Sequence, residues 1–153
     1  MIEMTQRELL RTANEIRREV EPHFRTDTAA QGFRGSTPST GHCAAVSVLM
    51  QARLGGEFVS AIVENGSHWF NRFDTADGSI DIDVTADQFG REPVVTATAG
   101  QLYDGTRVRT NQELNVETLQ RALLLARRSG MGEVAAQLQR ALDTMVVVAS
   151  GGG

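Results

Sequence analysis

The chain contains a single cysteine, Cys43, in the stretch GHCAAV, directly before a run of apolar residues. A free thiol has a pKa of about 8.5, and a helix N-terminus or a nearby imidazolium lowers it. The sequence predicts that a helix begins at Cys43, so that unpaired backbone N–H groups surround the sulfur. The same groups would stabilise the oxyanion that forms when a thiolate attacks a carbonyl. Cys43 is therefore the candidate nucleophile.

A histidine and an aspartate that could activate this thiol follow it in the sequence. His68 begins the stretch HWFNRF and Asp83 lies in SIDIDVT, with the turn sequence DTADG between them. If the two stretches pair as an antiparallel hairpin, His68 and Asp83 become direct cross-strand neighbours. The carboxylate would then orient the imidazole and stabilise its cation, as the third member of a catalytic triad. Asp81 shares a strand face with Asp83 and is the alternative, although this register places it nearer Phe70.

The cysteine is predicted to lie on a buried central helix. Residues 43–54 are apolar on nearly every side, as is typical of a helix inside a core. Gly55 and Gly56 would end this helix, because glycine readily adopts the left-handed conformation. The preceding residues 25–41 are rich in Thr, Ser and Gly and are predicted to form a loop.

Three further helices are predicted. The first runs from about Thr5 to Val20, because Thr5 and Glu8 have the spacing of a capping box. Asn115 would cap a second helix over residues 116–129, and a third covers residues 133–148.

The strands are predicted between these helices. EFVSAIV, HWFNRF and SIDIDVT are separated by turn sequences that contain Asn-Gly and Asp-Gly, which indicates an antiparallel meander. VVTAT is a further short strand, and YDGTRVRT is expected to be a turn. The sequence therefore predicts an α+β fold in which the buried cysteine-bearing helix packs on an antiparallel sheet. Residues 1–150 are expected to form one domain, and 151–153 a flexible glycine tail.

Composition and charge exclude several function classes. The formal net charge is −4, and no basic stretch indicates contact with nucleic acid. No apolar run reaches the roughly 20 residues that a membrane span needs. The charged N-terminus does not resemble a secretory signal, so a cytoplasmic location is expected. With one cysteine, an internal disulfide is excluded.

Together these residues resemble a known family. GHCA, GGE, SHWFNR, DG and DVTADQFG are similar to the motifs of the YunG family of small bacterial proteins, and more widely to the transglutaminase-like branch of the papain-like thiol superfamily. The resemblance covers residues 39–90 well and the C-terminal third hardly at all. The chain departs from the family pattern at His42, where glutamine is common, and in reading HWFN in place of HxWN.

The resemblance implies a papain-like or transglutaminase-like core and a triad. Its positions in this chain are Cys43, His68 and Asp83, with Thr85 completing an Asp-x-Thr motif. It implies no substrate.

Several alternatives accompany this interpretation. Cys43 could be an inert core residue, and His42, Cys43, His68 and Asp83 could form a mixed zinc site. His42 itself is not expected to act in catalysis, because neighbouring residues at a helix start point apart. Gln88 could position a substrate or lie on the surface.

The leading hypothesis is a cysteine-dependent acyl-transfer enzyme without a cofactor, acting on a protein, peptide or other amide. Backbone N–H groups at Cys43 and near Thr40 and Gly41 would hold the oxyanion. The acyl group would pass to water, in a peptidase, amidase or deamidase, or to an amine, in a transglutaminase. The alternative is a non-catalytic binding or inhibitor module, and the apolar C-terminal helices could form a homodimer or bind a partner protein.

Overall fold

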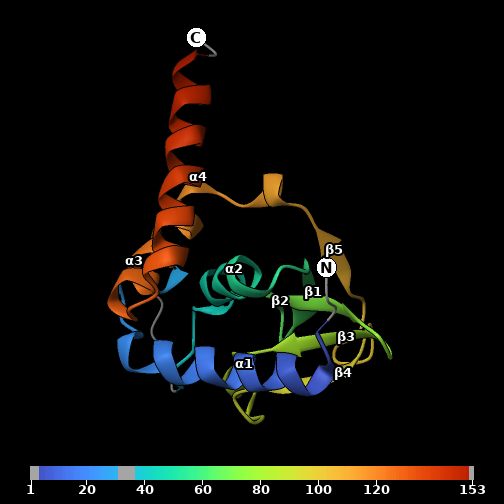
Figure 1. Cartoon of the computed structure of the whole chain (residues 1–153). Coiled ribbons are helices and arrows are strands. Elements are labelled where there is room, and N and C mark those ends of the chain that lie inside the picture. The colour runs from blue at the N-terminus through green and yellow to red at the C-terminus, as the bar shows by residue number, and fades with distance from the viewer. Residues whose placement is uncertain (1–3, 31–36, 152–153) are drawn as a thin grey trace.

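The computed structural model describes residues 4–30 and 37–151, without the side chains of 146–151. The described residues form four α-helices and a five-stranded antiparallel sheet (Figure 1). This arrangement confirms the α+β class that the sequence predicts.

The first helix, α1 (Gln6–Val20), begins where the capping residues predict. The side chain of Thr5 accepts a hydrogen bond from the Glu8 backbone N–H at 3.1 Å, which satisfies one of the unpaired donors at the helix start. Apolar side chains recur every three or four residues and are buried on one face: Leu9, Ala13, Ile16 and Val20. A short 3-10 turn, η1 (Glu21–His23), follows.

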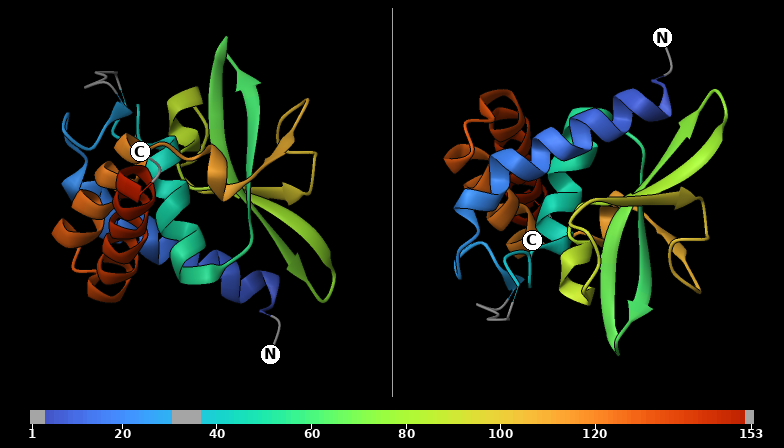
Figure 2. Two further views of the ribbon diagram at one scale, coloured as in Figure 1. Left: turned by 90° about the horizontal axis from the view of Figure 1, so that it is seen from above. Right: turned by 90° about the horizontal axis from the view of Figure 1, so that it is seen from below.

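The helix that carries the cysteine, α2 (Cys43–Leu54), lies between the sheet and the pair of C-terminal helices (Figure 2). Its central residues, from Ala45 to Met50, are all buried, as predicted. The helix ends at Gly55, which has a φ of 75°. The next residue, Gly56, passes so close to β2 that a Cβ would lie 2.6 Å from the Arg72 carbonyl oxygen. Only glycine fits there, which fixes the path from α2 into the sheet.

The sheet has the strand order β4-β3-β2-β1-β5. Its strands are β1 (Glu57–Val63), β2 (Gly66–Thr75), β3 (Gly78–Asp83), β4 (Val95–Thr98) and β5 (Arg107–Arg109). The first three form the predicted meander, and β4 corresponds to the further short strand that VVTAT predicts. The expectation that YDGTRVRT is only a turn is wrong, because part of it forms β5, which pairs with β1 from Phe58 to Ser60.

The two faces of the sheet are covered separately, because successive residues of a strand point to opposite sides. Phe58 and Phe73 pack in the main core with α1, α2 and the C-terminal helices. Val59 and Phe70 form a second cluster with Leu102 from the segment after β4. The sheet is therefore buried on both sides near its centre.

Two helices complete the fold, α3 (Val116–Arg128) and α4 (Gly132–Gly151). Asn115 caps α3 through its side chain, as predicted. The short 3-10 turns η3 (Ala86–Phe89) and η4 (Asn111–Glu113) were not expected from the sequence. Of the expected glycine tail, Gly151 belongs to α4, and residues 152–153 lie outside the described residues.

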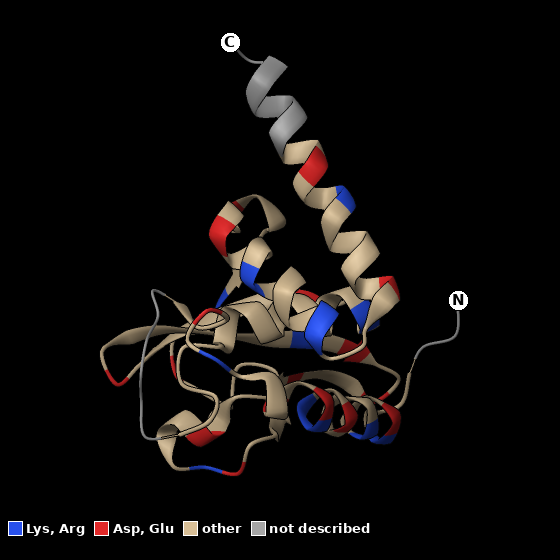
Figure 3. Cartoon of the chain, turned by 90° about the vertical axis from the view of Figure 1, so that its left-hand side faces the viewer, with Lys and Arg blue, Asp and Glu red and all other residues tan. Residues whose placement is uncertain are grey.

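None of the helices in residues 4–30 and 37–151 is both long and apolar enough to cross a membrane. Charges of both signs follow one another along α1 (Figure 3).

Candidate active site

Cys43 is the first residue of α2 and is partly exposed. It lines a cavity of about 290 Å³ together with His68 from β2 and Gln88 and Phe89 from η3. As the first helical residue, Cys43 has a backbone N–H without a carbonyl partner inside the helix. The structure therefore brings the predicted nucleophile and the predicted base to one open cavity.

His68 contacts the predicted third member of the triad. Its Nε2 lies 2.7 Å from Oδ2 of Asp83, and both side chains are almost completely buried. The ring stacks on Phe70, with the centroids 6.0 Å apart, and meets Phe89 edge to face at 4.7 Å. These rings hold the imidazole in one orientation.

The predicted hairpin register is wrong by two residues, although the contact forms. In the observed ladder Asn71 pairs with Ile82 and Arg72 pairs with Asp81, so His68 and Asp83 are not directly opposite. A shift of two keeps each side chain on its face of the sheet. The two therefore meet diagonally, a separation that long side chains can bridge.

Asp83 accepts hydrogen bonds on both carboxylate oxygens. Oδ1 accepts from the backbone N–H of Thr85 at 2.9 Å and from its hydroxyl at 3.2 Å. Oδ2 accepts from the Tyr103 hydroxyl at 2.6 Å in addition to its contact with His68. The two contacts from Thr85 give the Asp-x-Thr motif a physical reason, because they fix the carboxylate that faces the imidazole.

The surroundings of His68 alter its proton affinity. Burial alone would lower the pKa of the imidazole, but hydrogen bonds and charge interactions with Asp83 and Cys43 outweigh burial and raise the pKa to about 9. A neighbouring carboxylate acts in this direction because it favours the charged ring. His68 is thus mostly an imidazolium at neutral pH, as expected beside an anionic partner.

Tyr103 is a site residue that the sequence did not reveal. Burial and the charge of Asp83 both raise the pKa of its hydroxyl, so it stays protonated and donates to the carboxylate. Its ring also meets the His68 ring edge to face at 5.5 Å. Tyr103 lies between β4 and β5 in an irregular segment without periodicity, which left no sequence signal for its position.

Asp81 does not take part in this arrangement. Its carboxylate binds Arg72 in a two-point contact, at 2.7 and 3.0 Å, and accepts the Gly100 N–H at 2.9 Å. The expectation that Asp81 lies nearer Phe70 is wrong, because Asp81 pairs with Arg72. Asp81 therefore connects β3 to β2 and to the segment after β4, and Asp83 is the carboxylate beside His68.

His42 is buried and turned away from the site. Its Nε2 lies 2.7 Å from the Thr28 hydroxyl and its Nδ1 lies 3.1 Å from the Thr40 carbonyl oxygen. The ring lies against Phe24, with centroids 4.2 Å apart, and burial lowers the pKa of its imidazole. His42 therefore holds the loop before Cys43 in place.

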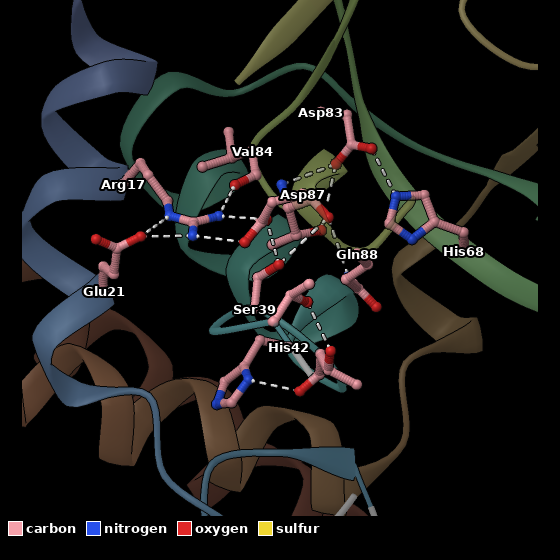
Figure 4. A network of polar contacts seen from close by, with 12 residues as sticks. Arg17, Glu21, Ser39, His42, His68, Asp83, Val84, Asp87 and Gln88 are labelled. Atoms are coloured by element: carbon pink, nitrogen blue, oxygen red, sulfur yellow. Dashed lines mark hydrogen bonds and ion pairs between the residues drawn. The ribbon is translucent and has the colours of Figure 1, made fainter. Parts of the chain in front are cut away.

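An ion-pair network around the buried Arg17 supports η3 from the side of α1 (Figure 4). Arg17 donates to both oxygens of Asp87, at 2.8 and 2.9 Å, and to the Val84 carbonyl oxygen at 2.9 Å. The hydroxyl of Ser39, in the loop before the cysteine, also contacts Asp87. Asp87 directly precedes Gln88 and Phe89, so the network positions two residues of the cavity.

Arg17 is the member of this network that the sequence indicates. Arg17 interrupts the apolar face of α1, four residues after Ala13 and three before Val20. A charged residue at such a position must be paired, but its partner, Asp87, is far away in the sequence and no local pattern identifies it.

The mixed zinc site considered from the sequence does not form among the described residues. Within 4–30 and 37–151, no group of three or more His, Cys, Asp or Glu side chains is arranged to hold a metal ion. His42 cannot join Cys43 and His68 because its ring nitrogens face Thr28 and Thr40.

The described chain is thus an α+β protein with a cysteine and a histidine at one cavity and a buried aspartate in contact with the histidine. The model of the YunG protein family matches residues 12–128, a region that begins within α1, ends with α3 and includes all three residues. The protein belongs to the YunG protein family. No curated protein and no solved structure matches the chain.

Proposed function

We propose that this protein is a cysteine-dependent acyl-transfer enzyme with the triad Cys43, His68 and Asp83, on a papain-like or transglutaminase-like core. One observation carries the proposal: the ring of His68 is held by Asp83 at 2.7 Å on one side and shares an open cavity with Cys43. A nucleophile, a base and a group that orients the base are the parts that such catalysis needs.

The first half of the reaction forms an acyl-enzyme. The Cys43 thiolate attacks the carbonyl carbon of an amide, a sulfur–carbon bond forms, and the carbonyl oxygen becomes an oxyanion. His68 gives its proton to the leaving nitrogen as the carbon–nitrogen bond breaks. Asp83 keeps the imidazole oriented and stabilises its charge before the transfer.

The second half releases the acyl group. Water attacks the thioester while His68 removes a proton from it, and the carbon–sulfur bond breaks to give an acid and the free thiolate. An amine would produce a new amide by the same steps. We favour water as the acceptor, because it is always present whereas an amine needs its own binding site.

The oxyanion would be held by donors that are free of other contacts. Of those expected near Thr40, the Thr40 N–H is used by the Thr37 carbonyl oxygen at 3.3 Å, and the His42 N–H by that of Ser39 at 2.9 Å. Donors at the cavity include the backbone N–H of Cys43 and the side-chain amide of Gln88. The amide nitrogen of Gln88 is anchored by the Thr85 carbonyl oxygen at 3.2 Å, which leaves its second N–H for a substrate oxygen.

Alkylation with iodoacetamide tests whether the thiol is activated. We expect Cys43 to react at pH 6.5 at least about tenfold faster than free cysteine, because a neighbouring imidazolium favours the reactive thiolate. The rate would be measured by intact mass, with Cys43→Ala as the control for adducts elsewhere. A rate equal to that of free cysteine would leave the thiol without activation and would favour the binding-module alternative.

A further inference from the structure

The cavity beside Cys43 contains one charged side chain besides the proposed catalytic pair. Glu64, at the tip of the β1–β2 hairpin, is the only other titratable residue among the described residues that line it. Much of the remaining lining is apolar, including Ala44, Val63 and Phe89, and Ser67 and Gln88 add uncharged polar groups. A ligand in this cavity would meet an apolar surface with a carboxylate at its mouth.

The charge of Glu64 is not engaged by the described part of the protein. None of the ion pairs between described side chains involves Glu64, and its side chain is exposed. A carboxylate without a cationic neighbour attracts positive charge and repels negative charge over roughly a Debye length, ~10 Å at 0.1 M salt. Its field therefore extends into the mouth of the cavity.

The backbone at Glu64 is unfavourable for a glutamate. Val63 pairs with Gly66, so Glu64 and Asn65 form a two-residue turn, and their φ angles are 49° and 68°. Such a turn favours Asn, Asp or Gly at both positions. Asn65 follows this preference and Glu64 does not. A residue kept in a conformation that disfavours it indicates a role for its side chain.

We propose that Glu64 selects acyl substrates that carry a positive charge on a flexible apolar stem, as a lysine or arginine side chain of a peptide does. This rests on the proposed function. The volume of about 290 Å³ is just below the range of about 300–1,000 Å³ for small-molecule sites, so the cavity suits one such side chain. Val63 and Phe89 would contact the stem, and Glu64 would bind the cationic end.

Three reagents that differ in one side chain test the proposal. The N-acetyl aminoacyl chloromethyl ketones of lysine, norleucine and glutamate would be reacted with the wild type and with Glu64→Gln, and the rate of Cys43 modification measured by intact mass. We expect the wild type to react fastest with the lysine reagent and slowest with the glutamate reagent. In Glu64→Gln the ratio of these two rates should fall by about fivefold or more, and 1 M salt should reduce the wild-type ratio, because the Debye length is then only about 3 Å. An unchanged ratio in the variant would overturn the proposal.

A second variant controls for the possibility that Glu64→Gln damages the hairpin. Glu64→Asn removes the charge and supplies a residue that the turn prefers, so it should lose the same selectivity while its melting temperature rises. Selectivity retained in this stable variant would contradict a role for the carboxylate.

The neutral norleucine reagent separates this proposal from the proposed function. Its rate should be unchanged in Glu64→Gln but should fall in His68→Ala. If its rate does not depend on His68, the proposed triad fails, whereas the ratio of the charged reagents still decides whether Glu64 selects by charge.

Discussion

Replacing His68 with alanine should slow the acetylation of Cys43 by p-nitrophenyl acetate at pH 7 by about 10²–10⁴-fold, the usual contribution of a positioned acid–base group. The variant loses the ring that Asp83 orients and whose interaction with Cys43 favours its charged form. The rate of adduct formation would be followed by intact mass. Because the sequence contains no lysine, lysine acetylation would not obscure the adduct.

The matched control for this substitution is His23→Ala, at the end of η1 and away from the cavity. His23→Ala should form the acetyl adduct at the wild-type rate, and Cys43→Ala should not form it at that rate. Equal rates for the wild type and His68→Ala would show that the histidine does not act on the thiol. The cavity would then be a binding site, in line with the alternative function.

The substitution Arg17→Gln should lower the free energy of unfolding by about 3 kcal/mol. Removing one partner from a buried ion pair costs about 3–5 kcal/mol. We expect the lower end of this range, because Asp87 stays partly exposed and keeps its contact with Ser39. For a chain of this size the melting temperature should fall by about 6–12 °C. Thermal unfolding followed by circular dichroism would measure the change.

The exposed neighbour Arg18 provides the control on the same helix. Arg18→Gln should change the melting temperature by only a degree or two, because it forms no ion pair with the described residues and surface substitutions have small effects. If Arg17→Gln is as stable as Arg18→Gln, the network does not hold η3 against α1. In Arg17→Gln we expect slower acylation of Cys43 in addition to the loss of stability, because η3 carries Gln88 and Phe89 into the cavity.

The sequence predicted the elements of this fold well where the signals are local. The Thr5 and Asn115 caps and the largely apolar stretch from Ala45 to Met50 indicate helices that the structure confirms. Turn residues identified the meander in the same way. The β5 strand was missed because its three residues, Arg107–Arg109, are held by pairing with β1 and are too few for their alternation of polar and apolar side chains to indicate a strand.

The sequence predicts the three residues of the candidate site but not the residues that hold them in position. The contact between His68 and Asp83 is predicted correctly although the register is wrong by two residues, because a shift of two leaves each side chain on the same face of the sheet. Tyr103 and the pair formed by Arg17 and Asp87 depend on contacts between distant segments, which no local pattern records.

The raised pKa of His68 also links the site to stability. A pKa of about 9 in the folded protein, against an ordinary value of 6.5, means that the charged ring stabilises the fold. This contribution is fully present below pH 6.5 and is lost as the pH rises through about 9. Asp83→Asn should remove it, because the carboxylate is the main group that favours the charged ring.

Titration of the His68 ring by NMR tests the coupling of cysteine, histidine and aspartate most directly, with the signal assigned by comparison with His68→Ala. We predict that the ring titrates with a pKa of about 9 in the wild type and well below that value in Asp83→Asn and, to a smaller extent, in Cys43→Ala. A ring that titrates at or below pH 6.5 in all three proteins would contradict the account, because neither the carboxylate nor the thiol would then be acting on the imidazole.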